Sequence, residues 1–279
     1  MSRSDQTKKW VLAAALLMTA PAAANRSAQH APHHIMSLKV CTDELLLDLV
    51  PTDRIASVTF LSREKASLAW WPQGAHVAVN HNTAEEILAT HSDLILTDSF
   101  TAPGLRPLLA KSGVRIVEVP PAENWEQIRA VTRQVAKAVG DVARGEALIA
   151  KMDATLRAVE THRPKTPLTV AEWGGGGFVP GTGGLFDVLL TTAGARNVER
   201  GSFAYYDVET LLAMKPDVLV YGDTYAGTAS LRADQDLHPA LLKRYTNRRI
   251  TYSALYNCGV PQSAEVARRL QNALLKVKP

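Results

Sequence analysis

Short apolar runs rich in β-branched residues alternate with helical patterns along the chain from residue 36 onward. In the first half the predicted strands are 36–40, 55–60, 94–97 and 114–119, and the predicted helices are 43–50, 84–90 and 105–112. The second half repeats the scheme, with strands at 168–172, 217–221 and 249–253 and helices at 185–193, 208–214, 239–245 and 262–276. Strands that alternate with helices predict an α/β fold with a largely parallel sheet.

Several helix ends carry their own signals. Thr83 and Glu86 form a capping box, in which hydroxyl and carboxylate close the first helical turn reciprocally. Thr42 is expected to cap the first helix without a matching glutamate. Gly113 and Gly194 are placed to end helices in the left-handed conformation.

A different pattern separates the two halves. Residues 124–139 are predicted to be helical, Gly140 and Asp141 interrupt them, and residues 142–161 continue as one amphipathic run. A helix of twenty residues spans about 30 Å, and the proline-containing segment 163–167 ends it. We therefore expect an N-terminal lobe over 35–140, a connecting helix over 141–163 and a C-terminal lobe over 164–279.

An internal repeat supports two lobes. Residues 84–96 match residues 208–220 at a constant offset of 124, and each segment reads as a helix, a polar turn, an aspartate and a buried strand. Glu85 and Glu209 stand at equivalent positions near the helix N-termini. A carboxylate there is favourable toward the helix dipole, which is a sufficient structural reason for it.

The first 24 residues have the pattern of a signal peptide. Lys8 and Lys9 precede an apolar run of about eleven residues, which is shorter than the roughly 20 that span a bilayer, and Ala22–Ala24 form a small-residue cleavage site. Cleavage near Ala24/Asn25 would leave a flexible leader over 25–34 and an exported, periplasmic protein. The cleavage site has no cysteine, so no lipid anchor is expected.

Composition and charge exclude some classes of function. The chain has 279 residues, of which 46% are hydrophobic and 21% charged, which is typical of a folded globular protein. Its net charge of +4 is too small for a protein whose affinity rests on neutralising phosphates, so we expect no nucleic acid as partner. Cys41 and Cys258 are the two cysteines. In an oxidising compartment they either bridge or remain as two separate thiols, and the sequence leaves both alternatives open.

The order and spacing of several segments resemble the periplasmic binding proteins of ABC importers. The resemblance covers roughly residues 34–277 and is closest to the subgroup that carries cobalamin and iron–siderophore or haem complexes. It rests on Ile35–Leu38, Cys41–Leu46, Arg54–Val58, the two repeat units, Gly181–Leu185, Ala193–Val198 and the late His238–Pro239. His91-Ser92-Asp93 departs from the Lys-Pro-Asp that is usual in the first repeat.

The resemblance implies an α/β fold of two Rossmann-like lobes joined by one long connecting α-helix, with a ligand cleft between the lobes. It implies a monomeric, non-enzymatic solute-binding protein that has no cofactor of its own and delivers a metal–chelate complex, a ferric siderophore or a cobalamin-type ligand, to a membrane permease. In such proteins one surface glutamate per lobe docks on arginines of the permease, and by position these are Glu85 and Glu209.

In a two-lobed fold the ligand is contacted by loops at the carboxyl ends of strands. The residues so placed, many of them aromatic, are Cys41, Thr42, Trp70, Trp71, Trp173, Phe178, Tyr225, Tyr256 and Cys258. Aromatic side chains suit a large flat or apolar ligand. The Trp70–Trp71 pair lies in a polar loop and is the least core-like of the set.

Two alternatives remain. A haem-binding protein of the same fold would use an axial Tyr, His or Cys, for which Tyr225, Tyr256 and Cys258 are available. An exported enzyme could use the glycine-rich loop 174–184 to hold a phosphate-containing ligand, although the loop matches no nucleotide-binding signature. No His or carboxylate spacing indicates a bare-metal site.

Overall fold

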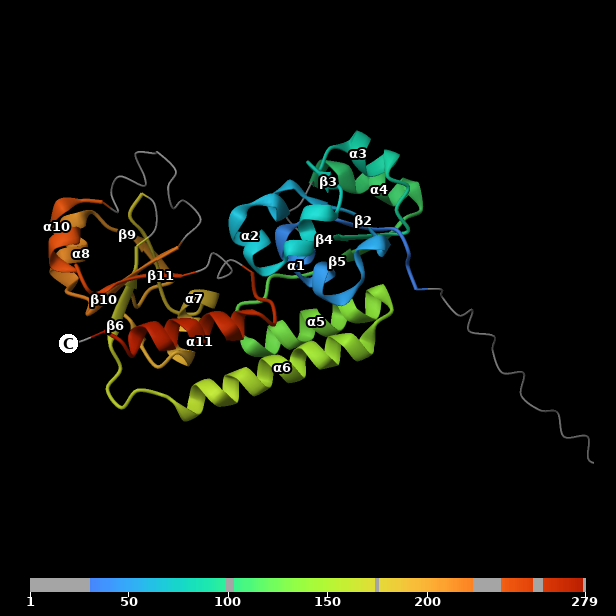
Figure 1. The fold of residues 1–279 in the computed structure, drawn as a ribbon. Coiled ribbons are helices and arrows are strands. Elements are labelled where there is room, and N and C mark those ends of the chain that lie inside the picture. Colours follow the sequence, from blue (N-terminus) through green and yellow to red (C-terminus); the bar gives the residue numbers. More distant parts are fainter. Residues whose placement is uncertain (1–30, 99–102, 174–175, 223–236, 253–257, 278–279) are drawn as a thin grey trace, which may run out of the picture. The chain divides into compact units, whose positions relative to one another are not determined.

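The computed structural model describes residues 31–98, 103–173, 176–222, 237–252 and 258–277 (Figure 1). The chain divides into two units, 1–30 and 31–279, and the second carries all the described structure. The predicted signal peptide and the predicted leader up to residue 30 lie outside the described residues. Within the described part, no helix combines the length and the apolar character needed to cross a membrane.

The N-terminal lobe is built on a parallel sheet with the strand order β3-β2-β1-β4-β5. Its strands are β1 (Ile35–Ser37), β2 (Ile55–Thr59), β3 (Val79–Asn80), β4 (Leu94–Thr97) and β5 (Arg115–Glu118). Its helices are α1 (Val40–Leu49), α2 (Lys65–Trp70), α3 (Ala84–Ala89) and α4 (Arg106–Ser112), with short 3-10 turns at 52–54, 60–63, 72–76 and 103–105. The central strands β1 and β4 are buried on both faces, as parallel strands covered by helices are.

The C-terminal lobe repeats this plan with the order β11-β10-β6-β8, again parallel. The strands are β6 (Thr169–Glu172), β8 (Arg196–Asn197), β10 (Val218–Gly222) and β11 (Arg249–Tyr252). The helices are α7 (Leu185–Thr192), α8 (Val208–Met214), α10 (Pro239–Arg244) and α11 (Ser263–Leu274). A separate antiparallel ribbon pairs β7 (Phe178–Pro180) with β9 (Phe203–Tyr205).

The internal repeat is visible in matching contacts. The backbone N–H groups of His33 and His34 donate to the Asp93 carboxylate at 2.7 and 3.1 Å, which fastens the start of β1 to the start of β4. Asp217 does the same in the other lobe, where it accepts from the Thr169 N–H at 2.7 Å at the start of β6. The repeat therefore has a structural basis: each aspartate satisfies backbone donors at the entry to its central strand pair.

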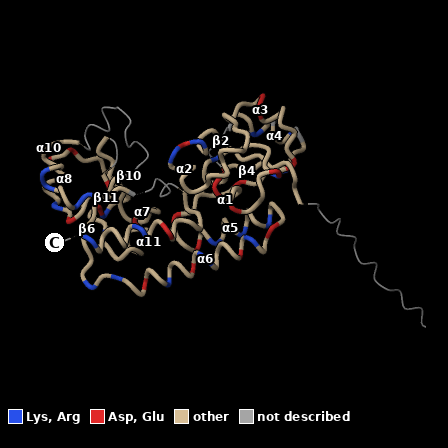
Figure 2. Tube along the Cα trace, in the orientation of Figure 1, with Lys and Arg blue, Asp and Glu red and all other residues tan. Residues whose placement is uncertain are grey.

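Two antiparallel helices run alongside both lobes. They are α5 (Trp125–Val139) and α6 (Val142–Thr161), and both carry interspersed acidic and basic side chains (Figure 2). Arg129 donates to Asp153 at 2.6 Å and so ties α5 to α6. The side-chain amide of Gln271 donates to the Val159 carbonyl oxygen at 2.8 Å and so joins α11 to the far part of α6. The helix predicted over 142–161 is α6, and the boundaries assigned to the lobes remain a prediction.

The local signals were right in most places and wrong in one. The capping box of Thr83 and Glu86 is present, and Gly113 and Gly194 have φ of 74° and 88°. The prediction that Thr42 caps α1 is wrong, because α1 begins at Val40 and Thr42 lies within its first turn. There its hydroxyl donates to the Lys39 carbonyl oxygen at 2.8 Å.

Candidate functional site

A cavity of about 490 Å³ lies between the two lobes. The N-terminal lobe lines it with residues that follow β1, β4 and β5, namely Lys39, Cys41, Thr42, Leu45, Asp98, Val119, Pro120, Pro121, Ala122 and Glu123, and with Val131 of α5. The C-terminal lobe lines it with Phe178, Pro180, Gly181, Gly184, Leu185, Phe186, Ser202, Phe203 and Gly259. Most of these side chains are apolar, so the cavity suits a ligand with a large apolar surface.

The topology of the first sheet explains the position of the cavity. The chain runs outward from β1 through β2 to β3 on one side and from β4 to β5 on the other, so the strand order reverses between β1 and β4. At such a reversal the loops leave in opposite directions and open a crevice at the carboxyl ends of the strands. Lys39 and Asp98 follow these two strands, and the Lys39 Nζ lies 3.2 Å from the Asp98 carboxylate.

Two helix N-termini and a few charged side chains reach the cavity. The N-terminal ends of α1 and α7 both reach the cavity, and neither helix has a side-chain hydrogen bond at its N-cap residue, Lys39 or Gly184. Helix N-termini carry partial positive charge. The Lys39 ammonium, which is 42% exposed, is paired with the Asp98 carboxylate, and Glu123 also lines the cavity, so the charged groups of the lining are one cation and two carboxylates.

The ribbon of β7 and β9 presents aromatic side chains to the cavity. Phe178 pairs with Tyr205 and Pro180 with Phe203 across the two strands. Directly paired residues share one face of a ribbon, so these four side chains stand together. The Phe178 ring centroid lies 6.0 Å from that of Phe203 and 5.6 Å from that of Tyr205. On the opposite face Val179 is buried in the core of the lobe.

The glycine-rich segment has a structural role in this ribbon. A Cβ atom on Gly177 would lie 2.1 Å from the Tyr206 carbonyl oxygen, and one on Gly181 would lie 1.9 Å from the Gly201 carbonyl oxygen, so only glycine fits. The N–H groups of Gly181 and Thr182 donate to the carbonyl oxygens of Ser202 and Gly201. Because the ribbon uses these two donors, the N–H groups of Gly181 and Thr182 are not free to hold a phosphate.

Cys41 and Cys258 form a disulfide, with Cα atoms 5.1 Å apart and a sequence separation of 217. The bond joins the first turn of α1 in the N-terminal lobe to the segment that precedes α11, and Cys41 and Gly259 both line the cavity. This answers the question that the sequence left open. In this bond Cys41 cannot act as a nucleophile, since only a free thiolate attacks a substrate.

The structure brings only part of the predicted ligand-contacting set to the cavity. Cys41, Thr42 and Phe178 line it, and Cys258 is bonded to Cys41 but is not part of the lining. Tyr225 and Tyr256 lie outside the described residues.

The tryptophans lie elsewhere. The expectation that the Trp70–Trp71 pair lies in a polar loop and is the least core-like of the set is wrong: Trp71 is 1% exposed within the main apolar core, and Trp70 ends α2 and packs against that core. The Arg269 guanidinium lies 4.2 Å from the centroid of the Trp70 ring, so this ring serves packing between α2 and α11. Trp173 is likewise 1% exposed in the core of the C-terminal lobe.

Other lining residues were not predicted. Asp98 directly follows β4 and Lys39 is the second residue after β1, so the rule of carboxyl strand ends could have found them. Phe203 and Tyr205 belong to a strand of three residues whose alternation with Ala204 was the only signal, and so short an alternation is weak.

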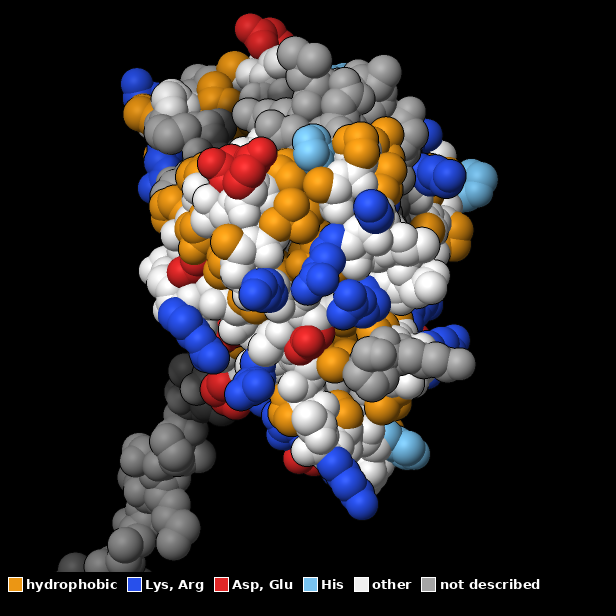
Figure 3. Space-filling view, turned by 90° about the vertical axis from the view of Figure 1, so that its left-hand side faces the viewer, with side chains coloured by type: hydrophobic (Ala, Val, Ile, Leu, Met, Phe, Trp, Pro, Cys, Tyr) orange, Lys and Arg blue, Asp and Glu red, His pale blue; other side chains and the backbone are white. Residues whose placement is uncertain are grey.

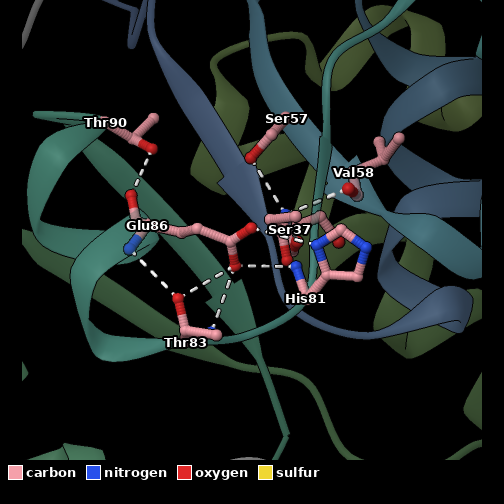
Figure 4. A network of polar contacts seen from close by, with 8 residues as sticks. Ser37, Ser57, Val58, His81, Thr83, Glu86 and Thr90 are labelled. Atoms are coloured by element: carbon pink, nitrogen blue, oxygen red, sulfur yellow. Dashed lines mark hydrogen bonds and ion pairs between the residues drawn. The ribbon is translucent and has the colours of Figure 1, made fainter.

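The two candidate docking glutamates are exposed and lie in the first turns of α3 and α8. In α3 the neighbouring carboxylate of Glu86 is engaged: it accepts from the N–H groups of His81 and Thr83 and contacts the His81 ring at 3.0 Å (Figure 4). Hydrogen bonds from His81 lower the pKa of Glu86 to about 2. Glu85 therefore lies next to a carboxylate that already caps the N-terminus of the helix.

On α8 the N-cap is Asp207, whose carboxylate accepts from the Thr210 N–H at 2.7 Å, so Glu209 is again the carboxylate not used by the cap. Figure 3 faces the end of the lobe that carries α8 and α10, and it shows acidic side chains in a few separate places among basic and hydrophobic ones. The residues that the structure describes contain no group of three or more His, Cys, Asp or Glu arranged to hold a metal ion.

Solved structures of low sequence identity share this fold. A periplasmic heme-binding protein from Roseiflexus sp. RS-1 is 22% identical, with a TM-score of 0.73 and coverage of 86% of this chain and 97% of that chain. A periplasmic vitamin B12-binding protein of Vibrio cholerae is 13% identical, with a TM-score of 0.65 and coverage of 88% and 97%. A molybdate-binding periplasmic protein of Haemophilus influenzae is 15% identical, with a TM-score of 0.70 and coverage of 87% and 86%.

No curated protein sequence matches the chain. The family model described as periplasmic binding protein matches residues 35–236, which is most of the chain and includes the central strands of both sheets and the ribbon. Two lobes of repeated α/β topology, a cavity at the carboxyl strand ends and this match agree with one another, and the chain belongs to the periplasmic binding protein family.

Proposed function

We propose that the protein is the periplasmic solute-binding component of an ABC importer and that it captures a metal–chelate complex, a ferric siderophore or a cobalamin-type ligand, between its lobes. The observation that carries this proposal is the cavity of about 490 Å³ lined by both lobes. Such a volume is within the usual range of small-molecule sites. A ligand there bridges the two lobes, and binding energy can then stabilise one lobe arrangement over another.

The disulfide supports the proposed location. Disulfides persist in oxidising compartments such as the bacterial periplasm and are rare in the cytosol. The Cys41–Cys258 bond therefore fits an exported protein, as does the signal peptide predicted for residues 1–24.

Haem is the second candidate ligand. The aromatic face of the ribbon favours a flat apolar molecule. Structures of similar fold include proteins named as heme-binding from Roseiflexus and from Vibrio cholerae, but at 22% and 18% identity they support the fold and not the ligand.

Delivery to the permease is proposed to use Glu85 and Glu209. Each is exposed in the first turn of equivalent helices, one per lobe, while the adjacent cap carboxylates of Glu86 and Asp207 are engaged. A pair of acidic contacts on separate lobes lets a partner recognise the arrangement of the lobes as well as the surface of each.

The test is equilibrium dialysis of the mature protein against a ferric hydroxamate siderophore, cyanocobalamin, haem and molybdate, with the bound ligand measured by absorbance or elemental analysis. We expect saturable binding of one chelate at micromolar affinity or better and no turnover of it. If the protein binds only molybdate, its ligand is an oxyanion and the proposed metal–chelate ligand is wrong. Binding of none of the four would contradict the proposed function.

A further inference from the structure

We propose that each lobe carries an aromatic docking point for the permease, formed by Phe60 stacked on His81 in the N-terminal lobe and by Tyr205 in the C-terminal lobe. Each docking point stacks on an arginine side chain of that partner. This inference rests on the proposed function and adds to it, because Glu85 and Glu209 are then only part of the docking surface.

The internal repeat places a ring at the same point of both lobes. Thr83 and Asp207, which are related by the offset of 124, are the N-cap residues of α3 and α8. Two positions before each N-cap residue stands a ring, His81 in one lobe and Tyr205 in the other. His81 directly follows β3, and Tyr205 is the last residue of β9. Each ring therefore precedes the docking glutamate of its lobe by four residues.

These rings are exposed where a lobe on its own would gain by burying them. The Phe60 ring stacks on His81 with centroids 5.4 Å apart and an interplanar angle of 15°. Phe60 is 45% exposed and the adjacent Leu61 is 38% exposed. Tyr205 is 70% exposed. Exposed apolar side chains that lie together are typical of a surface that binds a partner.

The ligand cavity does not account for these rings. Of the aromatic residues on the β7–β9 ribbon, Phe178 and Phe203 line the cavity and Tyr205 does not. Phe60 follows β2 and His81 follows β3, and neither belongs to the cavity lining. The rings therefore fit a partner that contacts the outer surface of the lobes.

The charge beside each ring indicates which side chain of the partner it meets. The His81 ring contacts the Glu86 carboxylate at 3.0 Å, and Glu86 is used by the helix cap, so Glu85 is the adjacent carboxylate that the cap leaves over (Figure 4). Tyr205 is related in the same way to Glu209. Arginine serves a carboxylate and a ring at once, because its planar guanidinium donates hydrogen bonds in a fork and also stacks on aromatic faces.

The arginines of this chain do not take that place. Arg63, three residues after Phe60, donates to a backbone carbonyl oxygen at 2.6 Å. In the part of the chain that the structure describes, the rings in contact with a guanidinium are those of Trp70, Tyr221 and Tyr245. Phe60 and Tyr205 are thus left to a cation that a partner brings.

The test measures binding of the protein to its permease, reconstituted in nanodiscs, by biolayer interferometry with no ligand added. The variant Phe60→Ala/Tyr205→Ala removes both rings, and Phe60→Leu/Tyr205→Leu keeps apolar surface without a ring. The matched control is Val142→Ala/Leu275→Ala, which truncates side chains that are 54% and 51% exposed, at the start of α6 and directly after α11. All truncated side chains are exposed, so the fold is expected to survive, and thermal unfolding checks this.

We expect the control to bind the permease as wild type does and both ring-free variants to bind it about tenfold more weakly. Wild-type affinity in the alanine variant would overturn the inference and leave the proposed function standing. Wild-type affinity in the leucine variant alone would also overturn it, because the contact would then be apolar and not a stacked guanidinium. A wild type that does not bind the permease would overturn the proposed delivery and the inference with it.

A double-mutant cycle tests whether one guanidinium contacts both the ring and the carboxylate. The fold-loss in Phe60→Ala/Glu85→Gln should be smaller than the product of the two single fold-losses, since either change alone breaks the shared contact. In Phe60→Ala/Glu209→Gln, which combines changes in different lobes, the fold-losses should multiply. Losses that multiply in both pairs would contradict a shared arginine.

Sedimentation velocity separates the permease from a second copy of the chain as the partner. We expect wild type and Phe60→Ala/Tyr205→Ala to sediment alike as monomers. A wild-type dimer that is lost in the alanine variant would assign the rings to self-association and overturn the inference.

Discussion

Asp43 is a fully buried carboxyl group in the first turns of α1, next to the residues that line the cavity. Its Oδ2 atom accepts from the Thr59 N–H at 3.1 Å, the Thr59 hydroxyl at 2.5 Å and the Ser62 hydroxyl at 2.8 Å, which fastens α1 to the end of β2. Desolvation outweighs these hydrogen bonds and raises the pKa of Asp43 to about 7. The neighbouring Glu44 is buried as well, and desolvation together with the charges of Asp43 and Asp48 raises its pKa.

The raised pKa predicts a stability that falls as the pH rises. Between about pH 4 and pH 7 the unfolded Asp43 is ionised while the folded one keeps its proton, so the unfolded state binds fewer protons and the free energy of unfolding decreases with pH. Through Asp43, the free energy of unfolding is expected to decrease by on the order of 2 kcal/mol between pH 5 and pH 7. The Asp43→Asn variant should lack this decrease. Urea denaturation at the two pH values measures it, with the exposed Asp53→Asn as control. An unchanged pH dependence in Asp43→Asn would contradict the prediction.

At the scale of elements, the ribbon depends on close backbone approach. Gly181 lies where the chain leaves β7, and its N–H donates to Ser202 at 2.9 Å while its Cα faces the Gly201 carbonyl oxygen. No side chain can enter this contact unless the two strands separate. The ribbon carries Phe178 and Phe203 into the cavity, so its packing and the shape of the cavity are coupled.

Gly181→Ala is therefore expected to destabilise the protein and to weaken ligand binding. Forcing a methyl group into a packed contact costs typically about 1–3 kcal/mol, and the displaced ribbon would lose its place in the cavity wall. Gly104→Ala is the control, because a Cβ atom there meets nothing within 4 Å. Denaturation midpoints and ligand dissociation constants of the two variants separate the effects. A Gly181→Ala variant as stable as wild type would show that the ribbon tolerates a side chain.

At the scale of the whole folded unit, the Cys41–Cys258 bond connects the two lobes beside the cavity. A crosslink over 217 residues removes much conformational freedom from the unfolded chain. It also limits how far the lobes can separate at that edge. Opening of the cleft is thus expected to be small, with α5 and α6 spanning the lobes on another side.

We expect Cys41→Ser/Cys258→Ser to lose about 2–5 kcal/mol of unfolding free energy. Reduction of wild type with dithiothreitol should reproduce most of this loss, while the same reductant should leave the double variant unchanged. Guanidinium denaturation with and without reductant measures both. A wild type whose stability is insensitive to complete reduction, verified by mass spectrometry of alkylated thiols, would contradict a stabilising role.

The proposed docking of both lobes predicts a separation of binding from delivery. Glu85→Lys/Glu209→Lys should bind ligand as wild type does but stimulate ATP hydrolysis by the reconstituted permease at least about tenfold less, because like charges now face the permease arginines. Glu64→Lys, another exposed glutamate of the N-terminal lobe, should stimulate normally. Undiminished stimulation by the double variant would remove these residues from the docking surface.

The sequence by itself determined the alternation of elements, the repeat and the helix ends, because these depend on short-range patterns. Strand β4 and helix α8 have the predicted bounds, and the capping box at Thr83 forms from residues three positions apart. The two-lobed fold could be predicted for the same reason. The hydrophobic periodicity is a short-range pattern, and the same pattern recurs at an offset of 124 residues.

The cavity wall and the disulfide depend on packing between distant segments of the chain. Whether an aromatic residue is core or lining depends on what packs against it from distant segments, and Trp71 and Phe203 show both outcomes: the first is buried under helices and the second stands free on a ribbon. Cys41 and Cys258 are joined because the two lobes bring positions 217 residues apart to a Cα separation of 5.1 Å. Such proximity arises only when the chain packs, so a local sequence pattern cannot predict it.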